Sequence, residues 1–231
     1  MAESFMGDTP LPEKLLDVYG RLLGRYGPQG WWPGDTWFEM MVGAVLTQAA
    51  AWGNVEQAIV NMKGAGAMSP RAVRGMPVER LAKLVYPSGY YNAKARKLKA
   101  LAEFLGNRFN DDLEAMKRED PWALRAELLD VHGIGEETAD DMILYPVGSP
   151  IFVIDSYTRR VFSRLGITPE KGPYSAYQAI FMDNLPADAE LMGEFHALID
   201  HHAASICRPE PSCHGCCLLD VCPTGARRTR N

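Results

Sequence analysis

The sequence lacks the features that would place this chain in a membrane or outside the cell. It contains no uninterrupted run of 18 or more apolar residues, which a membrane-spanning helix requires. Its first ten residues, MAESFMGDTP, have neither the basic segment nor the apolar segment of a secretory signal. We therefore expect a cytoplasmic, nucleoid-associated protein without a membrane partner.

Positive charge is also not in excess, because 24 Lys and Arg residues face 29 Asp and Glu residues, a net charge of −5. This balance argues against a protein that coats nucleic acid through bulk charge. A local basic face is still compatible with it, since affinity depends on the number of phosphates contacted. The candidate basic clusters are residues 94–99, 157–160 and 226–231.

Cysteine is absent before residue 207, and all five cysteines fall within residues 207–222. A disulfide framework would distribute its cysteines along a secreted chain, so this clustering indicates metal ligation. Four thiolates in one compact loop can hold a [4Fe–4S] cluster or a structural zinc, and their spacing alone does not separate the two. The candidate ligands are Cys207, Cys213, Cys216 and Cys222, with Cys217 left over.

Strand-like segments are almost absent. The one β-like run, PIFVI at 150–154, is short and isolated, and we expect an extended connector there. Apolar residues at helical spacing recur along the chain, as in residues 12–27, and capping residues followed by proline mark helix starts at 69–70 and 120–121. We predict an all-α protein of about ten helices joined by short loops.

Residues 132–141, HGIGEETADD, predict a tight turn between two helices. Gly133 and Gly135 flank Ile134, and two glycines so close allow backbone N–H groups to point outward where the next helix begins. Such a nest suits a phosphate group. Because acidic residues follow at once, the nest would depend on backbone donors and the helix dipole, and a monovalent cation could add to them.

The segment VHGIGEETA (131–139) resembles the helix–hairpin–helix motif of DNA-binding repair proteins. Twenty residues beyond Gly135, the segment VIDSYTRRVFSRLG (153–166) places Asp155 between an apolar run and an arginine-bearing helix. Together they look like the endonuclease III superfamily of DNA glycosylases, which implies a bilobal helix–hairpin–helix glycosylase fold. The resemblance implies that Asp155 is the essential carboxylate and that the hairpin contacts DNA through Gly133, Ile134, Gly135 and Thr138.

The chemistry expected of Asp155 follows from its position at a helix N-terminus, where the dipole keeps a carboxylate ionised. It can stabilise an oxocarbenium-like sugar or orient the attacking water, and capping the helix is compatible with both roles. Glu137 stands where lyase members of the family have a lysine. A carboxylate cannot form a Schiff base, so we predict a monofunctional glycosylase with water as its nucleophile.

In relatives of endonuclease III, a cysteine loop that follows the helix containing His196 holds a [4Fe–4S] cluster. The resemblance therefore favours the cluster over zinc, although the first gap holds five residues here and usually six in the family. Cys217 is expected to be a spare thiol, and its exchange with Cys216 as a ligand stays open. His196, His201 and His202 are expected to be surface or packing residues.

The segments WWPGDTWFEMMVGAVLTQ (31–48) and YPSGYYNAKARKL (86–98) resemble the type III branch of the 3-methyladenine DNA glycosylases. In that branch a glutamate also replaces the hairpin lysine. The resemblance implies a base pocket made of Trp31, Trp32, Pro33, Trp52 and Glu137. It also implies that Gln48 fills the space left by a flipped base, that Tyr90 or Tyr91 is a wedge, and that Asn92 and Lys94 make phosphate or turn contacts.

An alkylated purine fits such a pocket, because it is cationic, it is already a good leaving group, and indole rings attract cations by roughly 0.5–2 kcal/mol. The base must be extruded from duplex DNA before it can be excised. The sequence departs from the type III branch in two ways. That branch generally lacks the cysteine loop, and a lysine that lines its pocket aligns with Leu198 here.

The domain organisation that we expect has an N-terminal segment, 1–34, that packs with a C-terminal domain, 150–231. A central helical domain, 35–149, contains the hairpin, and DNA lies across the cleft between the two domains. The expected partner is double-stranded DNA containing a damaged base, bound by a monomer. Open alternatives are excision of oxidised pyrimidines, mismatched thymine or uracil, or adenine, and a non-catalytic DNA-structure-binding or redox-sensing iron–sulfur protein.

Overall fold

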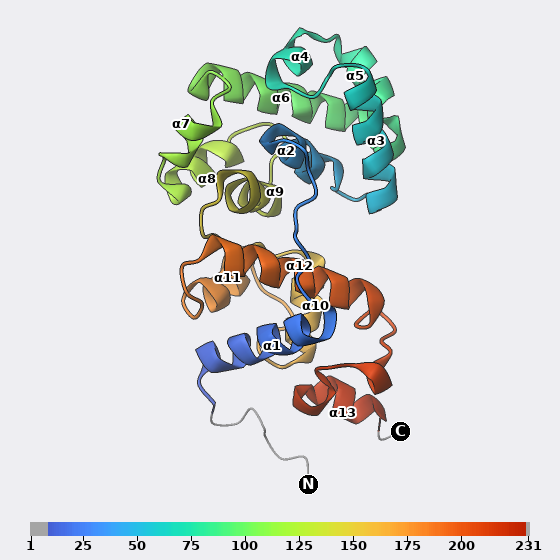
Figure 1. Cartoon of the computed structure of the whole chain (residues 1–231), viewed down its shortest axis with the longest axis vertical. Coiled ribbons are helices and arrows are strands. Elements are labelled where there is room, and N and C mark those ends of the chain that lie inside the picture. The colour runs from blue at the N-terminus through green and yellow to red at the C-terminus, as the bar shows by residue number, and fades with distance from the viewer. Residues whose placement is uncertain (1–8, 230–231) are drawn as a thin grey trace. The chain divides into compact units, whose positions relative to one another are not determined.

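The computed structural model of the chain describes residues 9–229, and every regular element in that range is a helix (Figure 1). The predicted all-α class is thereby confirmed. None of the described helices has the length and apolar character needed to cross a bilayer. The chain divides into two compact units: one runs from Trp32 to Ser149, and the other combines the residues up to Trp31 with those from Pro150 onward.

The unit Trp32–Ser149 is organised around helix α2, which is apolar on nearly every side and buried accordingly. Helix α2 contacts α3, α6, α9 and η2, and the first three surround it in Figure 1. The elements of this unit are α2 (Trp37–Leu46), α3 (Trp52–Gly64), α4 (Pro70–Gly75), α5 (Val78–Leu84), η1 (Tyr86–Ser88), α6 (Tyr91–Phe109), α7 (Leu113–Lys117), α8 (Pro121–Leu129), α9 (Glu136–Met142) and the π-helical turn η2 (Ile143–Val147).

The helix starts of this unit follow the capping signals in the sequence. Thr36 Oγ1 accepts a hydrogen bond from the backbone N–H of Glu39 at 3.2 Å, and Ser69 Oγ accepts one from Ala72 at 3.2 Å. Asp120 Oδ1 accepts from two backbone N–H groups of the first turn of α8, at 3.0 and 2.9 Å. The predicted starts at Ser69 and Asp120 are confirmed, with proline in the first turn of each helix.

The second unit has an aromatic core. The rings of Phe152 and Phe181 stack with centroids 4.0 Å apart, and Phe162 meets Phe181 edge-on at 4.8 Å. Helix α12 packs against both α1 and α10. The elements of this unit are α1 (Leu11–Tyr26), α10 (Ser156–Arg164), α11 (Tyr174–Met182), α12 (Ala189–Ser205), η3 (Cys213–Gly215), η4 (Leu219–Val221) and α13 (Pro223–Thr229).

The β-like run at 150–154 is an extended connector, as predicted, and its four apolar residues from Ile151 to Ile154 are at most 1% exposed. Buried backbone groups need partners, and here side chains of α11 supply them in place of a neighbouring strand. The Tyr174 hydroxyl accepts from Ile154 N at 3.0 Å, and Gln178 Nε2 donates to Phe152 O at 2.8 Å. The connector is therefore fixed up to the residue before Asp155.

Candidate functional site

The predicted helix–hairpin–helix is formed by α8, a turn through residues 130–135, and α9. Gly133 has a φ of +84°, and a Cβ added there would collide with the side chain of Lys97, so the position requires glycine for two separate reasons. Gly135 is the N-cap of α9 and its added Cβ would meet open space. Ile134 is 5% exposed and anchors the turn in the core.

An ion pair fixes the hairpin from α8. Arg125 Nε donates to Asp140 Oδ1 at 2.6 Å, and Asp140 is fully buried. Arg125 also lies 3.6 Å from Glu136 Oε1. The acidic residues after the turn thus differ in role: Asp140 is part of the hairpin's internal structure, whereas Glu136 and Glu137 are exposed.

Gln48, which was predicted as a site residue separately from the hairpin, lies against the hairpin residues Gly133 and Thr138. Gln48 follows α2, and its Nε2 donates to Gly133 O at 3.3 Å and to Thr138 Oγ1 at 2.9 Å. The next residue, Ala49, is exposed and has a left-handed backbone with a φ of +51°. The loop after α2 is therefore attached to the hairpin by side-chain hydrogen bonds.

The aromatic residues expected in a base pocket are partly assembled within the unit Trp32–Ser149. The ring centroids of Trp32 and Trp52 lie 6.0 Å apart, and those of Trp32 and Tyr145 lie 5.3 Å apart. Trp32 packs directly on Gly43 of α2, where an added Cβ would lie 3.0 Å from the indole nitrogen. Trp31 belongs to the other unit and is half-buried, and Pro33 is exposed.

Tyr145 was missed by the sequence-based prediction. Its half-buried ring completes the group with Trp32 and Trp52, which we call the aromatic group. Tyr145 could have been predicted from its position eight residues after Glu137, which is about two helical turns further along the chain. Pro146, which has no N–H to donate, follows it inside the π-helical turn η2.

The expected wedge segment lies at the start of α6. Tyr90 is 74% exposed and has a left-handed backbone with a φ of +44°, which is uncommon for a non-glycine residue. Tyr91 is half-buried, and its ring centroid lies 4.9 Å from that of Tyr86, a 63% exposed residue that the sequence did not single out. Asn92 is exposed. Tyr90 therefore presents an exposed ring at this segment, whereas Tyr91 packs beside Tyr86.

Lys94 was expected to make either a phosphate or a turn contact, and in the structure its contacts are with the turns. It is 1% exposed, and its Nζ donates to Leu46 O at 2.8 Å and to Ser88 O at 2.6 Å. Burial, together with the charge of Lys97, lowers the pKa of Lys94 to about 8. Its ammonium group joins the end of α2 to η1 and is not presented to a ligand.

Asp155 is the N-cap of α10, where its Oδ1 accepts a hydrogen bond from Thr158 N at 2.7 Å. Two residues of α12 lie beside it: one ligand atom from each of Asp155, His196 and Asp200 falls within 4.8 Å of the others. Burial lowers the pKa of His196, and the charge of Asp155 opposes that shift. The sequence alone could have indicated that His196 and Asp200 lie together, since residues four apart share one face of a helix.

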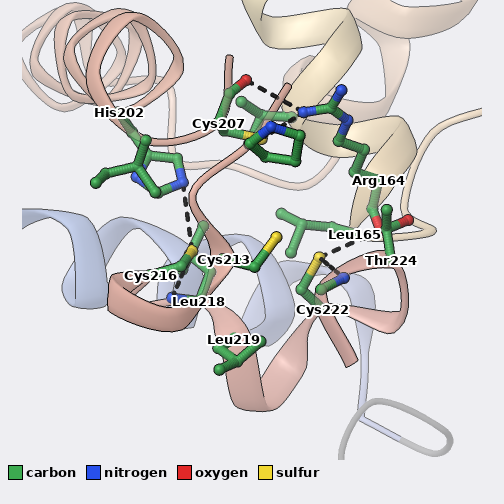
Figure 2. Close-up of a pocket in the computed structure, with 14 residues that line it drawn as sticks. Arg164, Leu165, His202, Cys207, Cys213, Cys216, Leu218, Leu219, Cys222 and Thr224 are labelled. Atoms are coloured by element: carbon green, nitrogen blue, oxygen red, sulfur yellow. Dashed lines mark hydrogen bonds between the residues drawn. The ribbon is translucent and has the colours of Figure 1, made fainter. Parts of the chain in front are cut away.

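The four predicted ligand thiols line one pocket, and Cys217 is not among the residues that line it (Figure 2). Several donors point at the sulfurs: Leu218 N lies 3.4 Å from Cys216 Sγ, Gly225 N lies 3.3 Å from Cys222 Sγ, and Arg164 Nη1 lies 3.4 Å from Cys207 Sγ. His202, buried as a packing residue, has its Nε2 3.7 Å from Cys216 Sγ. Donors of this kind suit thiolates.

The spacing of these thiols can be tested against each metal group. Tetrahedral zinc with bonds of 2.3 Å would bring its sulfurs to about 3.8 Å from one another. Among residues 9–229, one set of three potential ligands has its atoms within 4.8 Å of one another, and that set is Asp155, His196 and Asp200. No three cysteine sulfurs lie that close together, so the thiols are further apart than tetrahedral zinc would hold them. Burial raises the pKa of Cys216 to about 12, so a metal must displace that proton.

Comparison with known families agrees with this geometry. Residues 42–187 match the model of the HhH-GPD superfamily base excision DNA repair proteins. The chain is 41% identical over 211 residues to a protein of Methanocaldococcus jannaschii whose name assigns it to the DNA repair glycosylases, covering 91% of this chain and 96% of that protein. It is 27% identical over 196 residues to endonuclease III of Thermotoga maritima, covering 83% and 84%.

Solved structures share the fold. A trapped endonuclease III–DNA covalent intermediate superposes with a TM-score of 0.81 at 21% identity, covering 96% of this chain and all of that one. The H. pylori 3-methyladenine DNA glycosylase bound to 1,N6-ethenoadenine gives a TM-score of 0.73 at 28% identity, covering 85% and 98%.

Proposed function

The chain belongs to the HhH-GPD superfamily of base excision DNA repair proteins, and from this premise we propose that it is a monofunctional DNA glycosylase that excises alkylated purines. Its partner is double-stranded DNA containing a damaged base. The main observation that supports an alkylated purine as the substrate is the aromatic group of Trp32, Trp52 and Tyr145. The similarity to a 3-methyladenine glycosylase whose structure holds an etheno-modified adenine supports the same choice.

The aromatic group fits the chemistry of an alkylated purine. A purine alkylated at N3 or N7 carries positive charge, and a ring face attracts such a cation by roughly 0.5–2 kcal/mol. The charge also weakens the glycosidic bond, so the base leaves without strong acid catalysis. The protein's task is then to extrude the base from the stack and to hold it, and lesions that stack poorly are extruded at lower cost.

Asp155 is the group that we assign to the sugar. The dipole at the N-terminus of α10 favours negative charge at this position, and the bond from Thr158 N to Oδ1 fixes the orientation of the carboxylate. In this role it stabilises positive charge on the sugar or orients water toward C1′. Glu137, at the position of the lyase lysine, has no amine with which to attack the sugar.

A [4Fe–4S] cluster is the group that we propose for the cysteine pocket. Cys207, Cys213, Cys216 and Cys222 would hold it, since all four line one pocket and no three of their sulfurs lie within 4.8 Å of one another. Such a cluster, when bound, joins distant parts of the loop and can accept one electron. The surrounding N–H donors and Arg164 would offset the charge of the thiolates.

The proposal is tested with a panel of duplexes that contain 3-methyladenine, 7-methylguanine, thymine glycol, uracil or a mismatch. We expect the fastest release for 3-methyladenine, with an intact abasic strand as the product. Preferential excision of thymine glycol would overturn the choice of base. Borohydride reduction during turnover should give no strong protein–DNA adduct, and a strong adduct would overturn the assignment of water as nucleophile.

Excision of oxidised pyrimidines is the second candidate. Two observations favour it: the cysteine loop, which type III enzymes generally lack, and the similarity to endonuclease III over 83% of the chain. The same duplex panel separates the two functions, and it includes the mismatch and uracil substrates of the remaining enzymatic alternatives. A protein that bound all of these duplexes but excised none would be a binding or redox-sensing member of the family.

A further inference from the structure

Lys97, on α6, reaches across the hairpin. A Cβ added at Gly133 would overlap three carbons of the Lys97 side chain, so the lysine stem lies directly on this glycine. At the end of the stem, Lys97 Nζ donates to Gln48 Oε1. The residue is half-buried, although from the sequence it was only one member of the basic cluster 94–99.

These contacts leave Gln48 one amide orientation. An ammonium can only donate and a carbonyl can only accept, so Oε1 must face Lys97 and Nε2 must face Gly133 O. The second Nε2 hydrogen is directed at Thr138 Oγ1 at 2.9 Å. Without the ammonium, Gln48 Oε1 would lose a charge-assisted donor, and the side chain could rotate away from the hairpin.

We propose that Lys97 is a positioning residue that holds Gln48 against the hairpin for engagement of damaged DNA, an inference that rests on the proposed function. The loop that it stabilises includes Ala49, whose left-handed backbone carries strain and so needs restraint from its surroundings. One lysine side chain thus connects the loop after α2, through its ammonium group, with the hairpin at Gly133, through its stem. The hairpin itself contributes no Lys or Arg between residues 132 and 141.

The test uses two readouts on the full-length protein. One is the ratio of affinities for a duplex with a tetrahydrofuran abasic analogue and for an undamaged duplex. The other is the single-turnover excision rate at saturating protein. We expect Lys97→Met to lower both about tenfold, the loss typical of a hydrogen bond to a charged group, and Lys97→Arg to retain most of each.

A double-mutant cycle isolates the coupling. In a Gln48→Ala background, Lys97→Met should cause no further loss. The matched control is Arg96→Met, which removes one charge from the adjacent, exposed position of α6, and its effect should add to that of Gln48→Ala. Independent, additive losses for Lys97 and Gln48 would overturn the inference.

Salt dependence separates positioning from a direct phosphate contact. If Lys97 only positions Gln48, the slope of log affinity against log salt stays unchanged in Lys97→Met. A slope reduced by about 0.9 would mean that the ammonium contacts a phosphate, and it would overturn the inference. Thermal melting shows whether each variant is folded. If Lys97→Met unfolds, the same affinity ratio and excision rate are measured on Lys97→Arg, which retains the positive charge.

The failure of this inference is distinguishable from failure of the proposed function. If the wild-type protein excises no lesion of the panel, the proposed function is wrong. The affinity ratio for the abasic-analogue duplex requires no chemistry and still measures the coupling between Lys97 and Gln48. Absence of coupling in an active enzyme overturns the inference alone.

Discussion

The hairpin and the cysteine loop are both turns that bring candidate site residues together, but they differ in what stabilises them. The hairpin is held within the chain by the Arg125–Asp140 ion pair, by the buried Ile134 and by Gln48. The cysteine loop is formed by two short 3-10 turns around thiols, one of which has a pKa raised to about 12. A turn held by its own side chains keeps its shape alone, whereas we expect a loop built around half-buried thiols to depend on the metal group proposed for it.

The largest expected effect is therefore that of metal removal. Extraction of the iron with a chelator and a reductant should abolish the cooperative melting of the unit that contains Cys207–Cys222, because metal-bound thiolates contribute of order 10 kcal/mol in structural sites. The unit Trp32–Ser149 should melt as before. Calorimetry with and without the metal measures this, and metal analysis should give iron with absorbance near ~400 nm. Zinc alone in the purified protein would contradict the cluster.

The second largest effect is expected for the Asp155→Asn variant. We expect excision to fall about 10³-fold, some 4 kcal/mol, because the variant cannot stabilise charge on the sugar. Asparagine still caps α10, so the melting temperature should stay within a few degrees. Single-turnover kinetics and binding to abasic-analogue DNA measure the two properties. Unchanged excision would reject Asp155 as the catalytic carboxylate.

Asp140→Asn tests the internal support of the hairpin. Loss of one partner of a buried ion pair costs about 3 kcal/mol, so the unit Trp32–Ser149 should unfold at lower denaturant. The matched control is Glu136→Gln, whose partner is the same Arg125 but whose side chain is exposed, and its cost should stay below about 1 kcal/mol. Equal costs for the two variants would show that burial of Asp140 does not matter.

Gly133→Ala should have a smaller effect on stability, about 1–3 kcal/mol, because alanine resists the positive φ and displaces the Lys97 stem. DNA affinity should fall as well. Gly135→Ala is the control, since its added Cβ meets open space. Urea unfolding and fluorescence anisotropy measure both quantities, and a Gly133→Ala protein as stable as the control would contradict the required conformation.

Much of the fold was predictable because it depends on local signals. Caps at Ser69 and Asp120, helical periodicity and the glycines of the hairpin all act within a few residues. The site was less predictable. The sequence left open whether Lys94 contacts a phosphate or a turn, because the two carbonyls that accept its hydrogen bonds lie 48 and 6 residues away.

Contacts between residues far apart in the sequence also explain why the neighbours of the expected site residues were not predicted. Tyr145, Asp200 and the contact of Lys97 with Gln48 arise from packing between helices that are distant in the sequence. The sequence also left open whether Cys216 or Cys217 is a ligand. The pocket lining includes Cys216 and not Cys217, which follows from the path of the loop and not from the cysteine spacing.

The buried connector before Asp155 has a consequence for the order of folding. Asp155 caps α10 through a bond to Thr158, three residues away, which can form as soon as the helix does. The connector, in contrast, is held by Tyr174 and Gln178, about twenty residues further along the chain. We therefore expect the aspartate to gain its local geometry first and its final place only after α11 has docked, so that the site is completed late in folding.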